Sequence, residues 1–153
     1  MKNLSYLPRI AFIAIVAFCI NACDKEEVDV KYDIKGDWKV VSYKTSTVIT
    51  KTEENTWSQF NNGDVTVSFT ETDLTSGEIS GIKVTNSFSG DYTIDNKGTI
   101  TISNLFQTLI NEPEWGRLFD SISNAESYEV LDNRLIIYYN QKKNNITLEK
   151  LNE

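Results

Sequence analysis

The sequence contains no histidine and two cysteines in 153 residues. Without histidine there is no imidazole base, so Ser-His-Asp and Cys-His catalytic arrangements are excluded. Zinc sites built from cysteine and histidine are excluded as well, because Cys19 lies in an apolar N-terminal run and leaves Cys23 alone. We therefore expect a protein that is not an enzyme, with no cofactor and no bound metal.

Basic residues are also scarce. The chain has 15 Lys and Arg residues against 22 Asp and Glu residues, a formal net charge of −7 at pH 7. Basic residues occur side by side only at Lys142 and Lys143. A surface with this charge repels nucleic acid and anionic lipid, so nucleic-acid binding is excluded.

One long apolar run is present, from Ile10 to Ile20, after the basic residues Lys2 and Arg9. This is the order of a secretory signal peptide, whose apolar core is too short to span a bilayer. The run ends in Ile20-Asn21-Ala22-Cys23, which resembles a bacterial lipobox. The resemblance implies cleavage after Ala22 and lipidation of Cys23 with three acyl chains, palmitate included. The alternatives are a signal peptide cut nearby, with Cys23 an incidental thiol, or an N-terminal anchor that is never cut.

Removal of residues 1–22 would leave 13 basic and 22 acidic residues, a net charge of −9. The mature chain would have no free thiol, which fits an envelope protein without disulfides. Each buried methylene of an acyl chain contributes roughly 0.8 kcal/mol, so three chains would hold the protein at the membrane almost permanently.

Three segments follow from this organisation: a signal peptide over 1–22, a lipidated Cys and acidic tether over 23–34, and one folded domain over 35–153. The tether begins with Asp24-Lys25-Glu26-Glu27. A Lys followed by acidic residues looks like the surface-export signal of some Gram-negative lipoproteins. We expect an outer-membrane lipoprotein, either exported to the cell surface through this signal or held by a plain solvated linker.

Apolar and polar residues alternate along the domain, which predicts half-buried strands. The residues expected to face the core are Trp38, Val40 and Ser42; Val65, Val67 and Phe69; Ile82 and Val84; Tyr92 and Ile94; Ile100 and Ile102; Tyr128 and Val130; Leu135, Ile137 and Tyr139; and Ile146 and Leu148. Asp95 to Gly98 is expected to be a hairpin turn in which Gly98 has a positive φ. Of the adjacent pair Tyr138 and Tyr139, we expect Tyr138 to lie on the surface.

One segment has the period of a helix. Its apolar residues at i, i+3, i+4 and i+7 are Trp115, Leu118, Phe119 and Ile122. We expect a helix from about Glu112 to Ala125 that packs this face against the sheet. Asn111 is the expected N-cap, Glu114 would complete a capping box, and Pro113 would lie in the first turn.

The order of features resembles the META domain, which occurs in bacterial envelope lipoproteins. The resemblance rests on Gly36-Asp37-Trp38, Asn86 with Gly90 and Tyr92, Thr108, Phe119 and Ile122, and a final hairpin with Tyr128, Leu135 and Leu148. It covers Lys35 to Leu151 and implies a mainly β fold with one helix (α+β). The sheet would be small, curved and antiparallel, an incomplete β-barrel with the helix inserted before the last strands.

The family is linked to envelope stress rather than to a defined reaction, so the resemblance implies a binding, structural or stress-related role. Thr85 stands where the family often has the Cys of a Gly-Cys-Asn, and the Cys that commonly follows the Thr before the helix is also missing. A disulfide or redox role is therefore not carried over.

Two other functions stay open. Gly36-Asp37-Trp38 also matches the Gly-x-Trp that opens a lipocalin barrel, so the chain could be a lipocalin-like carrier of a small apolar ligand. Its cavity would be lined by Val40, Val67, Tyr92 and Ile137, although a lipocalin has about eight consecutive strands before its helix. A carboxylate-dependent hydrolase ranks last.

The acidic residues considered for a hydrolase are Asp64, Glu71 and Asp73, and Glu126, Glu129 and Asp132. Their spacing fits no metal loop, and solvated turns are the expected setting. Trp57 and Phe60 lie in a polar stretch, where they could form a contact patch for a protein or glycan. We expect instead that both fold back against the sheet. The membrane, reached through the N-terminal lipid, is the one partner that the sequence specifies.

Overall fold

Alternating apolar residues produce a sheet that dominates the domain. The computed structural model describes residues 33–151, and its strands in that range are β1 (Gly36–Lys44), β2 (Val48–Thr50), β3 (Thr66–Asp73), β4 (Ser76–Ile82), β5 (Ser87–Ile94), β6 (Ile100–Gln107), β7 (Ser127–Leu131), β8 (Arg134–Tyr139) and β9 (Asn144–Lys150). The helical elements are η1 (Glu53–Asn55), η2 (Asn61–Gly63), α1 (Glu114–Arg117) and η3 (Leu118–Asn124), of which only α1 is an α-helix. The predicted α+β class, mainly β with one helix before the last strands, is confirmed.

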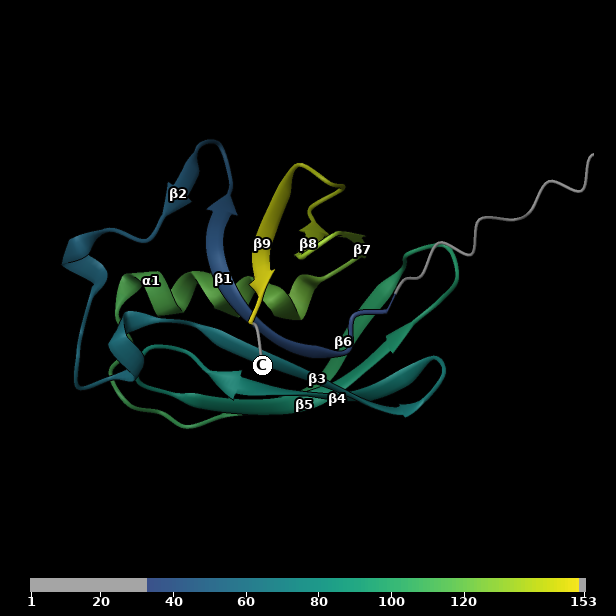
Figure 1. The fold of residues 1–153 in the computed structure, drawn as a ribbon, viewed down its shortest axis with the longest axis horizontal. Coiled ribbons are helices and arrows are strands. Elements are labelled where there is room, and N and C mark those ends of the chain that lie inside the picture. Colours follow the sequence, from purple (N-terminus) through teal and green to yellow (C-terminus); the bar gives the residue numbers. More distant parts are fainter. Residues whose placement is uncertain (1–32, 152–153) are drawn as a thin grey trace, which may run out of the picture. The chain divides into compact units, whose positions relative to one another are not determined.

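The sheet is antiparallel and curls into a half-barrel (Figure 1). Its order is β6-β5-β4-β3-β1-β9-β8-β7, and the short β2 pairs with β1. The strands at the two ends of this order approach each other at a bridge between Thr99 and Ser127. There, Ile100 N–H donates to Glu126 O at 3.2 Å, and Tyr128 N–H donates to Gly98 O at 2.8 Å. The predicted incomplete barrel is therefore present.

The interior of the half-barrel is filled by one apolar cluster, and the segment formed by α1 and η3 packs into it. The buried residues of the strands are Trp38, Val40 and Tyr43 of β1, Val67 and Phe69 of β3, Ile79 of β4, Phe88 and Tyr92 of β5, Ile100 and Ile102 of β6, Tyr128 of β7, Leu135 and Ile137 of β8, and Ile146 and Leu148 of β9. Trp115 meets Tyr43 edge-on at 4.8 Å between ring centroids, and Phe119 meets Phe88 at 5.0 Å. With Ile122 also buried, the predicted core-facing side of the helix is confirmed.

The inward faces of two strands differ from the prediction. In β1 the register shifts between Val40 and Ser42, and this irregularity turns Tyr43 into the core in place of Ser42. Ile82, predicted to face the core, ends β4 with 44% of its surface exposed. The buried face of β4 carries Ile79 and Gly77 instead, because alternation places Ile82 on the opposite face.

The helix also begins and winds differently from the prediction. Its N-cap is Pro113, without a side-chain hydrogen bond, so the predicted Asn111 cap and the box with Glu114 are wrong. The residue before a proline is disfavoured in helical conformation, which keeps Glu112 outside the helix. The α-helical part is a single turn, and the remainder is the 3₁₀-helix η3.

The β5–β6 hairpin has the turn that was predicted. Gly98 has a φ of 78°, and the Asp95 carboxylate accepts the N–H groups of Lys97 at 2.8 Å and Thr99 at 2.9 Å. The Thr99 bond, followed by the Lys97 bond, lowers the pKa of Asp95 below its usual value. This contribution to stability is present above the pKa of the unfolded state and is lost as the pH falls through the lower, folded-state pKa.

The folded domain begins slightly earlier in the chain than predicted. The predicted signal peptide, Cys23 and most of the predicted tether lie outside the described residues. Ile34, assigned to the tether, is buried, and its carbonyl accepts the indole N–H of Trp38 at 2.8 Å. The packed domain thus includes the residue before Lys35. Within residues 33–151, no helix has the length and apolar character needed to cross a membrane.

Gly81 tests the packing of the curved sheet. A Cβ there would overlap the carbonyl oxygen of Thr66 and approach the ring of Phe88 to 2.8 Å. Gly81→Ala should therefore lower the free energy of unfolding by about 1–3 kcal/mol. Ser80→Ala, at the preceding position on the strand, should change the free energy of unfolding by less than about 0.5 kcal/mol. Urea denaturation of the three proteins measures both effects, and equal midpoints for Gly81→Ala and wild type would contradict this packing.

Candidate functional site

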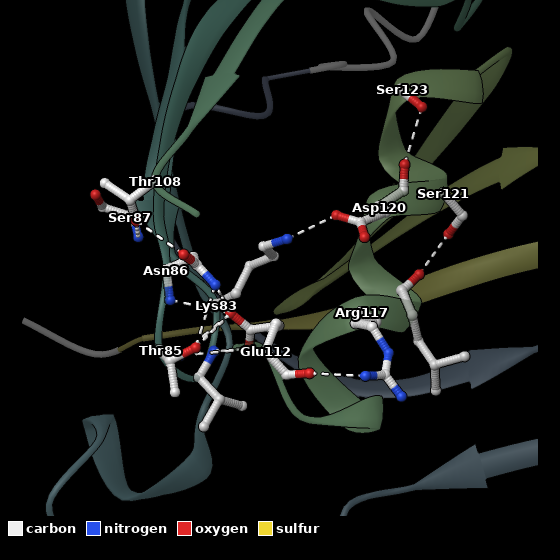
Figure 2. Close-up of polar contacts among 12 residues, drawn as sticks. Lys83, Thr85, Asn86, Ser87, Thr108, Glu112, Arg117, Asp120, Ser121 and Ser123 are labelled. Atoms are coloured by element: carbon white, nitrogen blue, oxygen red, sulfur yellow. Dashed lines mark hydrogen bonds and ion pairs between the residues drawn. The ribbon is translucent and has the colours of Figure 1, made fainter. Parts of the chain in front are cut away.

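The turn between β4 and β5 surrounds the carboxylate of Glu112. Val84 N–H donates to Glu112 Oε1 at 2.8 Å, Thr85 N–H reaches both oxygens at 3.3 Å, and Asn86 N–H donates to Oε2 at 3.0 Å. The Thr85 hydroxyl adds a bond of 2.9 Å to Oε2. Successive backbone N–H groups directed at one point form an anion-binding nest. Here the anion is a side chain of the same protein, as Figure 2 shows.

Asn86 extends this nest to the chain that follows β6. Its Nδ2 group donates to Glu112 Oε2 at 2.6 Å and to Ile110 O at 2.8 Å. Its Oδ1 atom accepts the Ile110 N–H at 2.6 Å and the Thr108 hydroxyl at 3.0 Å. The side chain is 2% exposed and uses both ends of its amide. We call Val84, Thr85, Asn86, Thr108 and Glu112 the carboxylate hub.

The helical segment packs against the other side of Glu112. Arg117 Nη1 donates to the main-chain oxygen of Glu112 at 3.0 Å. Gly116 lies directly against the carboxylate, since a Cβ at this position would overlap Glu112 Oε1 and lie 2.7 Å from Cδ. A residue without a side chain is therefore needed for Glu112 to enter the nest. The first turn of the helix and the carboxylate hub thus depend on one another.

A second polar contact joins the sheet to the helical segment beside the hub. Lys83 Nζ lies 2.6 Å from Asp120 Oδ1, with the lysine side chain 3% exposed and the aspartate 51% exposed (Figure 2). Burial raises the pKa of Tyr43 well above its usual value, and the charges of Asp120 and Glu112 raise it further. Tyr43 is therefore a neutral phenol over the physiological pH range. Two connections, one hub and one ion pair, fix the helical segment across the half-barrel.

The chemistry that the hub can support follows from its hydrogen bonds. Both oxygens of Glu112 accept hydrogen bonds from the protein, and only 7% of the residue is exposed. A carboxylate satisfied in this way is held in one place and has no lone pair directed at solvent. It ties the β4–β5 turn to the chain before α1, which is a positioning role.

The acidic residues considered for a hydrolase lie in ordinary surface settings. Asp64 pairs with Lys51 at 2.7 Å, and Glu71 pairs with Lys35 at 3.7 Å. Asp73 accepts the Ser76 hydroxyl and the Thr75 N–H, which lower its pKa in that order.

The second acidic group is equally engaged. Glu126 accepts Gln141 N–H at 2.8 Å, and Glu129 accepts the Tyr138 hydroxyl at 3.1 Å and lies 3.5 Å from Lys142. Asp132 is in an exposed turn with a φ of 54°. Among the described residues, no group of three acidic or cysteine side chains is placed to hold a metal ion.

The four residues proposed to line a ligand cavity are all buried. Val40, Val67, Tyr92 and Ile137 are between 0 and 3% exposed and belong to the single apolar cluster. An open groove of about 460 Å³ lies elsewhere, at the outer side of β1, β3 and β4. Its lining residues are Asp37, Thr66, Val67, Ser68, Gly81, Ile82 and Leu151. One of the four predicted residues, Val67, is thus shared with this groove.

Three remaining predicted positions have separate outcomes. Trp57 packs against the apolar cluster, as predicted, whereas Phe60 is 46% exposed and does not fold back. The lipidation site Cys23 lies outside the described residues.

The hub itself was missed by the sequence interpretation. Asn86 and Thr108 entered it only as part of the family resemblance, and Glu112 was assigned to the helix. A usable signal was present: Glu112 directly precedes a proline and follows a long stretch, residues 98–111, that contains no charged side chain. An acidic residue in such a setting is more consistent with an internal partner than with a solvated helix start.

Comparison with known proteins agrees with the fold. A family model described as the META domain matches residues 33–151. A DUF4847 family protein from Bacteroides vulgatus ATCC 8482 has a similar crystal structure, with a TM-score of 0.56 and 17% sequence identity. That match covers 84% of this chain and 98% of the other, and at this identity it is a likeness of fold. Among curated proteins, no sequence matches this chain.

Replacement of the hub carboxylate tests the site. Glu112→Gln keeps the shape but directs an NH₂ group at donors of residues 84–86, leaving buried groups without acceptors. We expect a loss of about 2–3 kcal/mol in the free energy of unfolding, measured by urea denaturation at pH 7. Glu114→Gln, two residues on and exposed, is the matched control and should stay within about 0.5 kcal/mol of wild type. A Glu112→Gln protein as stable as the control would show that the hub is not a stabilising contact.

Proposed function

The chain belongs to the META domain family, and on that premise we propose that it is a lipid-anchored protein of the bacterial envelope, acting by binding or structural support rather than by catalysis. The observation that carries the proposal is the lipobox-like Ile20-Asn21-Ala22-Cys23, which closes an apolar leader shortly before the folded domain. Acylation of Cys23 would place the domain beside a membrane and keep it there.

Three features support a non-catalytic role. The sequence has no imidazole, the acidic residues considered earlier are engaged in turns and surface pairs, and the buried carboxylate of Glu112 is used within the fold. The groove at the outer side of β1, β3 and β4 offers a contact surface of mixed character, since Ile82 and Leu151 line it together with Thr66 and Ser68. A protein or glycan partner is the kind of ligand that such a groove would contact.

The proposed location is the outer membrane. Asp24-Lys25-Glu26-Glu27 directly follows the lipidation site, and its resemblance to a surface-export signal supports transfer to the cell surface. The net negative charge of the mature chain would keep the anchored domain from associating non-specifically with its neighbours.

The lipocalin-like carrier stays a second prediction. Its chain order would place the helix after the barrel strands, whereas here α1 and η3 lie between β6 and β7. A carrier also needs an interior cavity of roughly 300 Å³ or more. Trp38, Tyr43 and Phe69 occupy the interior of the half-barrel, each 1% exposed.

The anchor is tested by metabolic labelling with a fatty-acid analogue. Wild type should incorporate the label, and Cys23→Ala should not, because the acylated thiol is removed. Equal labelling of the two proteins would contradict the proposed lipid anchor. Cys19→Ala is the control for loss of a cysteine elsewhere in the leader, and it should retain the label.

The site of action is tested in a strain of the source bacterium that lacks the protein. Where loss of the protein makes the envelope sensitive to detergent, wild type should restore resistance, whereas Cys23→Ala, which lacks the acylated thiol, should not. Full restoration by Cys23→Ala would show that the domain acts without the lipid.

A further inference from the structure

The end of β6 and its connection to α1 present large apolar side chains to solvent. Phe106 is 71% exposed, Leu109 90% and Ile110 61%. All three fall within five consecutive residues, 106–110, which we call the apolar loop. An exposed patch of this kind marks a contact with another protein or with a membrane.

Charged residues are absent from the apolar loop and from the two chain segments that pair beside it. Residues 98–111 contain no Asp, Glu, Lys or Arg, and neither do residues 84–90, which include the beginning of β5. β5 and β6 pair along this end of the sheet, with Ser89 opposite Phe106 and Phe88 opposite Gln107. In a chain with 24% charged residues, such uncharged segments are a local property. The charged residue that follows the apolar loop, Glu112, is 7% exposed and already hydrogen-bonded within the fold, so it adds little desolvation cost if the apolar loop enters an apolar medium.

The apolar loop is also held in place from behind. Thr108 N–H donates to Ser87 O at 3.0 Å, and the Thr108 hydroxyl accepts Ser87 N–H at 3.1 Å. The N–H and C=O groups of Ile110 are both bound by Asn86 of the carboxylate hub. These bonds fix the backbone while its apolar side chains stay exposed. They also satisfy three main-chain groups internally, the N–H of Thr108 and the N–H and C=O of Ile110, which lowers the cost of bringing this backbone to a lipid surface.

We propose that the apolar loop inserts into the surface of the bilayer that holds the Cys23 acyl chains, so that the domain is attached at two points. This inference rests on the proposed lipid anchor. A neutral, apolar tip is the part of an acidic protein that can approach a lipid surface without electrostatic repulsion.

The length of the chain before the domain permits both contacts. Lys35 forms an ion pair with Glu71 of β3. In the sheet, Glu71 is opposite Gly77 of β4, and Gly77 is opposite Tyr92 of β5. Measured along the strands, the described chain therefore begins near the position of Tyr92. The apolar loop is level with Ser87, about 17 Å away along β5 at roughly 3.3 Å per residue. From Cys23 to residue 33 an extended chain spans up to about 35 Å. The anchor and the apolar loop can therefore reach the same bilayer.

Site-specific fluorescence in the acylated, full-length mature protein tests this inference. A cysteine introduced as Leu109→Cys can be labelled with an environment-sensitive nitrobenzoxadiazole dye, because the other mature cysteine, Cys23, is acylated. Leu74→Cys, 88% exposed in the turn between β3 and β4, is the matched control. Both proteins are reconstituted in vesicles of phosphatidylethanolamine and phosphatidylglycerol. We expect a blue shift and quenching by doxyl-labelled lipid at position 109, with neither at position 74.

The other outcomes are distinct. A blue shift at position 109 without doxyl quenching would show burial against a protein, a second copy included, and would overturn the inference. Equal quenching at both positions would indicate general adsorption and would also overturn it. Protein that carries the acyl mass and floats with vesicles, yet shows no change at position 109, would overturn the apolar-loop contact and leave the anchor intact. Absence of the acyl mass would overturn the anchor and this inference together.

Discussion

The bond between the Glu112 carboxylate and the β4–β5 turn is the interaction on which the rest of the fold depends. It uses three successive N–H groups that would otherwise lack partners at the end of a hairpin, and it fixes the chain just before α1. The position of that first turn sets the contacts of Trp115 with Tyr43 and of Phe119 with Phe88. A single buried acid thereby links the β4–β5 turn to the helical segment. The cost of desolvating it is offset by hydrogen bonds at both oxygens.

Local periodicity was enough to predict most of the architecture. Two-residue alternation located β3 and the strands from β5 to β9, and the spacing of Trp115, Phe119 and Ile122 located the helical face. Periodicity failed to predict the structure where the backbone departs from a regular strand or α-helix. The irregularity after Val40 reverses the face of the strand, and no property of Ser42 or Tyr43 taken alone indicates it. The 3₁₀ winding of η3 has the same origin, because sequence patterns do not distinguish it from a frayed α-helix.

The carboxylate hub was less predictable, since its parts come from three separate places in the chain. Thr85 and Asn86, Thr108, and Glu112 become neighbours only once β5 pairs with β6. Capping rules assigned Asn111 and Glu114 to the helix start and placed Pro113 in the first turn, whereas Pro113 is the N-cap. These rules consider only contacts within the helix, and they do not predict that Glu112 accepts the N–H groups of a distant turn.

The pairing of β1 with β9 has a consequence for the order in which the chain folds. The first long strand and the last strand of the domain are adjacent near the middle of the sheet, with Val40 opposite Leu148. The two halves of the sheet cannot be joined until the C-terminal residues are available, because the separation in sequence is nearly the whole domain. Folding of this kind is slow and finishes late. A chain that stays open until its end has been synthesised can be threaded across a membrane first and become compact on the far side.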